Sequence, residues 1–299
     1  MNALLLHTPT HRLRPAGRRP PGAPVRVLTP PDGAGAAGSE GSDPSAPRFS
    51  VVVPALDEAA HLGRTLRSLL GQQVDQPVEI IVVDNGSTDG TADVARAHGV
   101  RVLHEPRRGV CAARQRGAEA ARGAIIVSTD ADTVHPSGWL RTIDATFTAR
   151  PDAVAVAGPC RYDDGPAWTR RYPALLFGLV ATVAEATGRV TYVSATNLAV
   201  RRSAFPGYDL EQTQGGDELD LLRRLRPQGA VLWDRSNTVT TSARRLQRGA
   251  LHGFVVSLLG RYLLTYAVNR LVRRRVLGTA PAVRDDADAL QALDVLHGV

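Results

Sequence analysis

The sequence predicts an α/β protein with a mostly parallel central sheet flanked by helices, and three observations support this prediction. Apolar, β-branched runs at 50–53, 79–83 and 124–128 are typical of strands that are buried on both faces. Stretches with helical spacing of apolar residues lie between these runs, and such alternation predicts βαβ units. Acidic residues follow directly after the strands, which is where ligands bind in open sheets of this kind.

The composition limits the classes of function. Of the 299 residues, 43% are hydrophobic, which is enough for a sizeable core, and the formal net charge is +7. All of the basic side-chain charge comes from arginine, because the sequence contains no lysine. This excludes a Walker A lysine, a Schiff-base lysine and a kinase-type phosphate lysine.

The cysteines and the N-terminal region indicate the compartment and the first domain boundary. Cys111 and Cys160 lack the spacing of a metal or redox site, so a reducing cytoplasm is expected. The apolar stretch at 3–6 is too short for the core of a signal peptide. Residues 1–47 are rich in proline, glycine and arginine without apolar periodicity, which predicts a disordered tail.

A single domain is expected over residues 48–245, beginning with the strand at 50–53. The strand at 79–83 precedes a helix that ends near His98, where Gly99 is a natural C-cap. Between these two strands an amphipathic helix is expected, with leucines at helical spacing: Leu62, Leu66, Leu69 and Leu70.

The pattern continues through the rest of the domain. A short strand at 100–104 precedes a helix over 111–121, and the strand at 124–128 follows. No G-x-G-x-x-G follows the first strand, so a dinucleotide-binding fold is not expected. The remaining expected elements are a strand at 153–158, a helical excursion over 166–190, a segment at 192–200, a helix opened by acids after 216, and strands at 231–234 and 238–242.

Acidic side chains gather at the ends of the predicted strands. Asp130 and Asp132 end the strand at 124–128, and positions two apart on an extended chain point the same way. Two carboxylates so placed suit a hard divalent cation that keeps open positions for phosphate oxygens. The simpler alternative is a solvated turn in which one aspartate caps a helix. The other acids at strand ends are Asp57, Glu58 and Asp84, and their convergence favours a binding site.

Five motifs follow one another along the chain: 51–58 (VVVPALDE), 82–90 (VVDNGSTDG), 109–117 with its Ala-Arg pair, 130–132 (DAD) and 216–218 (GDE). In this order they resemble family 2 glycosyltransferases of the GT-A fold. The resemblance covers roughly residues 49–245, and the motifs are specific as a set although each is weak alone.

The resemblance implies a donor site for a nucleotide-diphosphate sugar. Asp84 is then expected to accept a hydrogen bond from the base, and Arg114 to lie beside the nucleoside. Asp130 is expected at the ribose or in the metal's shell, and Asp132 as a ligand of Mg²⁺ or Mn²⁺. The other expected donor-binding residues are Pro54, Ala55, Asp57 (where the family usually has asparagine), Glu58, Asn85 and Asn197, whose alternative role is to cap a turn. Arg245 and its neighbour Arg244 suit a diphosphate or an anionic acceptor, because arginine binds phosphate through two hydrogen bonds, and a solvated basic face is the alternative.

The resemblance also implies a catalytic base. Asp217 is the favoured residue and Glu218 the alternative, because the family usually has Glu-Asp where this chain has Gly216-Asp217. Glycosyl transfer expels a diphosphate that a divalent cation stabilises, while a carboxylate takes the proton of the attacking hydroxyl. One base and a single displacement predict inversion at the anomeric carbon.

The C-terminal region is expected to form a basic amphipathic helix over 246–278, followed by a short acidic tail over 279–299. Polar residues recur every four positions within 250–272, and arginines flank this stretch. The arrangement over 244–275 suits a helix on an anionic membrane surface. Packing against the main domain or in a dimer contact is the alternative.

Together these features predict a cytoplasmic, metal-dependent, inverting hexosyltransferase on the inner face of the cell membrane. Its acceptor is expected to be a lipid-linked or cell-envelope glycan precursor. A sugar-phosphate nucleotidyltransferase is one alternative, but the glycine-rich basic loop that it needs after the first strand is missing. A catalytically silent nucleotide-binding protein is another. Nucleic acid is not expected as a partner, because the basic residues concentrate at the chain's two ends.

Overall fold

The computed structural model describes residues 27–28, 46–210, 217–244, 268 and 271. The predicted N-terminal tail and C-terminal helix lie almost entirely outside the described residues, and Arg245 and the acidic tail lie wholly outside them. The strands are β1 Phe49–Ala55, β2 Val78–Asp84, β3 Arg101–His104, β4 Ile125–Ser128, β5 Ala153–Ala157, β6 Cys160–Tyr162, β7 Leu198–Arg201, β8 Ala230–Trp233 and β9 Val239–Thr241. The α-helices are α1 Ala59–Leu70, α2 Thr91–Ala97, α3 Val110–Ala120, α4 Trp139–Ala149, α5 Ala167–Thr187 and α6 Asp217–Leu225.

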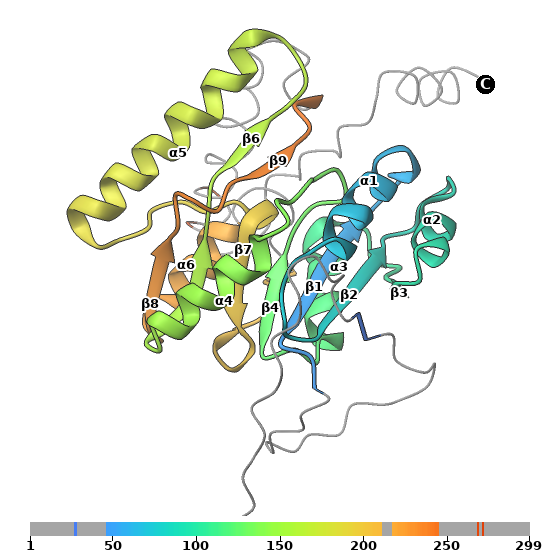
Figure 1. Ribbon diagram of the computed structural model, residues 1–299, viewed down its shortest axis with the longest axis horizontal. Coiled ribbons are helices and arrows are strands. Elements are labelled where there is room, and N and C mark those ends of the chain that lie inside the picture. The colour runs from blue at the N-terminus through green and yellow to red at the C-terminus, as the bar shows by residue number, and fades with distance from the viewer. Residues whose placement is uncertain (1–26, 29–45, 211–216, 245–267, 269–270, 272–299) are drawn as a thin grey trace, which may run out of the picture.

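The predicted α/β fold with a mostly parallel sheet is confirmed. Seven strands form one sheet in the order β3-β2-β1-β4-β7-β5-β8 (Figure 1), in which only β7 runs antiparallel to its neighbours. The strand β7 is shorter than the segment expected at 192–200, because a 3₁₀ turn at Ala195–Asn197 precedes it. A separate parallel pair, β6–β9, lies with α5 beyond the main sheet (Figure 1).

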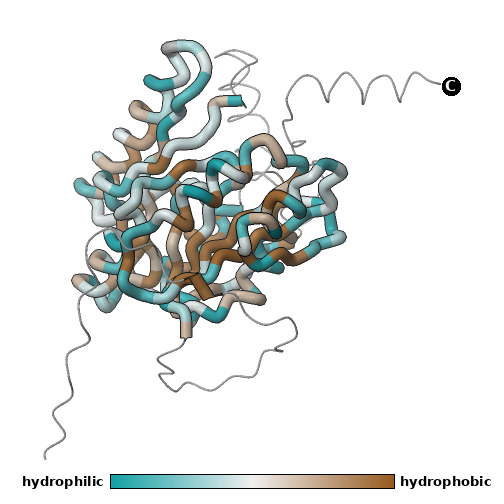
Figure 2. Tube along the Cα trace, turned by 45° about the vertical axis from the view of Figure 1, so that its right-hand side comes forward, coloured by the Kyte–Doolittle hydropathy of each residue, from teal (hydrophilic) through white to brown (hydrophobic). Residues whose placement is uncertain are grey.

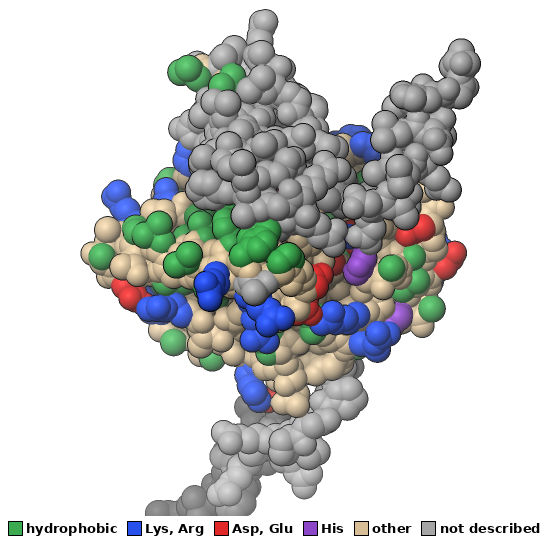
Figure 3. All heavy atoms as spheres, turned by 90° about the horizontal axis from the view of Figure 1, so that it is seen from above, with side chains coloured by type: hydrophobic (Ala, Val, Ile, Leu, Met, Phe, Trp, Pro, Cys, Tyr) green, Lys and Arg blue, Asp and Glu red, His purple; other side chains and the backbone are tan. Residues whose placement is uncertain are grey.

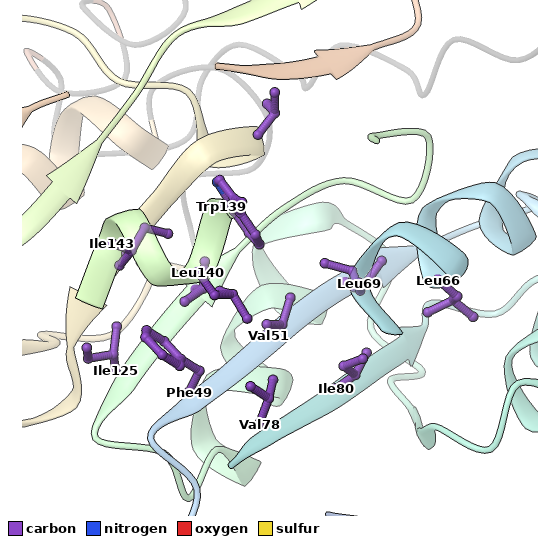
Figure 4. Packing of buried hydrophobic residues seen from close by; sticks show 14 of the residues in the cluster. Phe49, Val51, Leu66, Leu69, Val78, Ile80, Ile125, Trp139, Leu140 and Ile143 are labelled. Carbon is purple, nitrogen blue, oxygen red and sulfur yellow. The ribbon is translucent and has the colours of Figure 1, made fainter. Parts of the chain in front are cut away.

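The core forms on both faces of the central strands, as their apolar sequences require. On one face Phe49 and Val51 pack with Leu66 of α1 and Trp139 of α4, and all four are fully buried (Figure 4). Figure 2 shows the hydrophobic residues concentrated along these strands and the hydrophilic ones around them.

On the opposite face α3 lies very close to β1. A Cβ atom added at Gly117 would stand 2.3 Å from Cγ1 of Val52, so only glycine fits there. This close approach fixes the position of the helix that carries Arg114.

Within the part of the chain that the structure describes, no helix is both long enough and apolar enough to cross a membrane.

Candidate active site

The carboxyl ends of three neighbouring strands meet at one edge of the sheet. β1 pairs in parallel with β2 and with β4, and the register sets Ala55 beside Asp84. The residues that follow these strands therefore lie near one another, as the sequence predicts. Seen from this side, acidic side chains show in the middle of the surface with arginines beside them (Figure 3).

The turn after β1 is fixed by Asp57. Its backbone has a positive φ of 52°, a conformation that Asp and Asn tolerate better than most residues. Its Oδ1 accepts a hydrogen bond of 2.6 Å from the backbone N–H of Thr88, and Ser87 Oγ accepts one of 3.0 Å from the N–H of Asp57. Asp57 thus joins this turn to the loop after β2. Pro54 and Ala55 lie at the buried end of β1, and their predicted contact with the donor stays a prediction.

Asp84 ends β2, and Asn85 follows it directly. Oδ1 of Asp84 accepts a 3.0 Å hydrogen bond from the N–H of Ser87. The buried Asn85 side chain donates to the carbonyls of Glu105 and Arg107 at 2.9 and 2.7 Å, and accepts from the N–H of Gly109 at 2.8 Å. Through these three contacts Asn85 holds in place the segment that leads into α3.

Arg114 lies at the centre of a buried ionic cluster. Its Nη1 donates to Oδ2 of Asp217 and its Nη2 to Oδ1 of Asp130, both at 2.9 Å. Oε1 of Glu218 lies 4.0 Å from Nη1, and Thr196 Oγ1 donates to Oδ2 of Asp130 at 2.6 Å. Burial alone would lower the pKa of Arg114, but Asp130 and Asp217 outweigh it and raise the pKa well above its usual value.

A second ionic cluster contains Arg244, Glu58 and Asp132. Arg244 binds both oxygens of Glu58, and its Nη2 also lies 3.0 Å from Oδ2 of Asp132. Thr241 Oγ1 donates to the other oxygen of Asp132 at 3.0 Å. Burial raises the pKa of Glu58, while Arg244 acts in the opposite direction. Arg244 comes just after β9 and 186 positions after Glu58, so only the fold brings them together.

The two clusters show which of the acidic side chains could bind a divalent cation together. Asp130 and Asp132, predicted to share a metal, contact different arginines. Among the described residues no group of three or more His, Cys, Asp or Glu side chains is placed to hold a metal ion. Glu58 and Asp132, however, point at the same nitrogen of Arg244. Two hard oxygen donors at one point fit a Mg²⁺ or Mn²⁺ ion that takes its other ligands from water and phosphate.

Asn197 does not reach the solvent side of the site. Its side chain is 2% exposed, and Oδ1 accepts from Nε1 of Trp139 at 2.9 Å. Its Nδ2 donates to the carbonyls of Pro159 and Asn237 at 3.1 and 2.7 Å. The amide therefore joins β7, α4 and the segment before β9, a role closer to capping a turn than to the donor contact expected from the sequence.

The loop after β4 is held by residues that the sequence analysis did not identify. Thr65 Oγ1 donates to the carbonyl of Ala131 at 2.7 Å. The buried His135 ring lies between Ser68 Oγ, at 3.0 Å from Nδ1, and Thr129 Oγ1, at 2.8 Å from Nε2. In the sequence only the hydroxyl residues Thr65 and Ser68 on the inner side of α1 could have indicated these contacts, and hydroxyl residues are too common in helices to predict them.

His135 predicts a measurable dependence of stability on pH. Burial lowers its pKa from 6.5 to about 3, so between these values the unfolded chain binds the proton and the folded chain does not. The stability present above pH 6.5 is therefore lost as the pH falls toward 3, by up to about 1.4 kcal/mol per pH unit. Urea unfolding of wild type and His135→Gln between pH 7 and 4.5 should show the steeper loss in wild type. If the unfolding free energies of the two proteins fell equally with pH, the lowered pKa of His135 would be contradicted.

Comparisons with known proteins show the family to which the chain belongs. The family profile described as glycosyl transferase family 2 matches residues 50–208. The chain is 31% identical over 202 residues to a pre-mycofactocin glycosyltransferase of Mycobacterium tuberculosis, a match that covers 64% of this chain but only 42% of that protein. It is 30% identical over 214 residues to an uncharacterised glycosyltransferase of Mycobacterium bovis, covering 70% and 94%.

Among solved structures, the fold is similar to that of a mannosyltransferase from Pyrobaculum calidifontis in complex with GDP-Man and Mn²⁺. The TM-score is 0.56 at 23% identity, and the match covers 85% of this chain and 81% of that chain. This likeness supports the GT-A type of fold.

Proposed function

Because the chain belongs to glycosyl transferase family 2, we propose that it transfers a sugar from a nucleotide-diphosphate donor to an acceptor hydroxyl. The observation that carries the proposal is the pair of ionic clusters at one edge of the sheet, around Arg114 and around Arg244. This edge is where an α/β sheet binds nucleotides, and its charged groups suit a diphosphate and a cation.

The donor is proposed to lie across the ends of β1, β2 and β4. Asp84 is assigned to the base and the turn from Pro54 to Glu58 to the nucleoside, while Arg114 and Asp130 support the ribose side. Asp132, with the donor's own phosphates, is assigned to hold Mg²⁺ or Mn²⁺. The bound cation would offset the charge that develops on the leaving diphosphate. That the similar mannosyltransferase was crystallised with GDP-Man and Mn²⁺ supports this assignment.

The catalytic base is proposed to be Glu218, not the Asp217 favoured by the sequence. A base must first be within reach of the hydroxyl whose proton it takes. The Asp217 side chain is 2% exposed and binds Arg114, whereas Glu218 is 12% exposed on the same first turn of α6. Asp217 is then the residue that holds Arg114 in place. A single base and one displacement give inversion at the anomeric carbon.

The acceptor and location are proposed from the sequence. The basic, amphipathic stretch at 244–275 suits the inner face of the cell membrane, and its length and spacing support a peripheral attachment. A protein placed there would act on a lipid-linked or cell-envelope glycan precursor.

The test is a turnover assay with UDP-, GDP-, dTDP- and ADP-sugars, each with Mn²⁺ and with sugar or polyprenyl-phosphate acceptors. We expect one class of nucleotide sugar to be consumed with release of the nucleoside diphosphate. A chelator of divalent cations should stop the reaction. The anomeric configuration of the product, read by NMR, should be inverted. Release from none of the donors with any acceptor would contradict the proposed function.

A further inference from the structure

Arg244 occupies the point where the carboxylates of Glu58 and Asp132, which together fit a cation, meet. One of its nitrogens, Nη2, contacts both Glu58 and Asp132, and its Nη1 lies 3.0 Å from Oε2 of Glu58. The side chains of Arg244, Glu58 and Asp132 are only 14, 12 and 10% exposed. Charges so little hydrated need a counter-ion, because solvent screens them poorly. Arg244 supplies that counter-ion to both acids.

The segment around Arg244 is anchored by its backbone. The carboxylate of Asp164 accepts hydrogen bonds from the N–H of Ala243 and from Ser242 Oγ, the latter at 2.6 Å. The N–H of Arg244 donates to Ser242 Oγ at 3.3 Å. Asp132 is likewise held through its other oxygen by Thr241. The guanidinium can therefore turn away from Asp132 while the strand end and the acid stay in place.

A divalent cation ligated by both Glu58 and Asp132 would lie where Nη2 of Arg244 lies, because that nitrogen contacts both acids. Two positive groups at that point repel each other, so a cation that binds alone must first displace Arg244. A bound diphosphate relieves this repulsion, because its oxygens ligate the cation and also accept hydrogen bonds from the displaced arginine.

We propose that Arg244 is an internal competitor of the metal ion, and that it makes metal and nucleotide bind as a cooperative pair. The metal binds weakly until a diphosphate arrives to receive the displaced guanidinium. This mechanism rests on the proposed function of the site, and it assigns to Arg244 a regulatory role in addition to any contact with the donor.

The test measures binding and does not depend on turnover. Free Mn²⁺ is titrated by electron paramagnetic resonance against the full chain, alone and with saturating UDP or GDP, for wild type and Arg244→Gln. In wild type we expect the nucleotide to tighten Mn²⁺ binding about tenfold or more. In Arg244→Gln we expect Mn²⁺ alone to bind about tenfold tighter than to wild type, and the nucleotide to tighten Mn²⁺ binding by a smaller factor than in wild type, because only the ligation by the diphosphate then remains.

The matched control is Arg64→Gln. Arg64 lies on α1 near the same edge, its side chain is 61% exposed, and it pairs with Asp163. This variant removes the same charge and should keep the wild-type coupling. Equal Mn²⁺ affinities of wild type and Arg244→Gln, with equal coupling, would overturn the inference and leave the proposed function standing. Absence of Mn²⁺ binding in every protein, with and without nucleotide, would instead count against the metal-dependent function itself.

Discussion

Replacing Glu218 by glutamine is expected to lower kcat by about a thousandfold, within the range that a general base contributes. The amide has nearly the same shape but cannot take the proton of the acceptor hydroxyl. Since Glu218 lies 4.0 Å from Nη1 of Arg114, whereas Asp217 and Asp130 lie at 2.9 Å, the affinity for nucleotide and the stability should change less than in Asp217→Asn. Steady-state kinetics and nucleotide titration, run on the same preparation, separate these effects.

Asp217→Asn is the control that distinguishes the two candidate bases. Asp217 binds Arg114 through a buried ion pair, so its loss should lower stability and weaken nucleotide binding together with activity. If Asp217→Asn instead folds and binds nucleotide normally but lacks turnover, while Glu218→Gln stays active, then Asp217 is the base and our assignment is wrong.

Replacing Arg114 by methionine is expected to have the largest effect on stability. The methionine side chain fills similar space, but the buried carboxylate of Asp217 and the partly buried carboxylate of Asp130 lose their ion pair with Arg114. Removing one partner of a buried ion pair typically costs about 3–5 kcal/mol of unfolding free energy. Urea denaturation monitored by circular dichroism gives this difference directly, provided that unfolding remains two-state.

Two further variants make the Arg114 result specific. Asp217→Asn combined with Arg114→Met should recover part of the loss, because the orphaned carboxylate is then neutral. Arg150→Met removes an arginine from an exposed pair with Asp152 and should leave the stability close to that of wild type. Equal losses for Arg114→Met and Arg150→Met would show that the buried cluster does not stabilise the fold.

Strand positions and strand-end acids were readable from the sequence for a local reason. Apolar, β-branched runs such as 79–83 mark buried strands, and in a parallel sheet the residues after such strands must meet at one edge. The spacing of Asp130 and Asp132 is equally local. These features depend on neighbouring residues, so no knowledge of tertiary contacts was needed.

The partners of those acids were not readable, because they come from distant parts of the chain. Arg114 and Asp217 are 103 positions apart, and Glu58 and Arg244 are 186 apart. Only the fold assigns Asp130 to one arginine and Asp132 to another. For the same reason Asn85 and Asn197 look like ligand-binding amides in the sequence, whereas their hydrogen bonds join separate segments of the protein.

The two strand-end clusters are proposed to form a donor site for a nucleoside diphosphate and a cation. Thermal unfolding of the full chain with UDP, GDP, dTDP or ADP, each with and without Mn²⁺, tests this claim most directly, because a ligand of the folded state raises its apparent stability. We expect one of the four nucleotides to raise Tm, and only when Mn²⁺ is present. The Asp132→Asn variant should not show that rise. Unchanged Tm of the wild-type protein with all four nucleotides at millimolar concentration would contradict the claim.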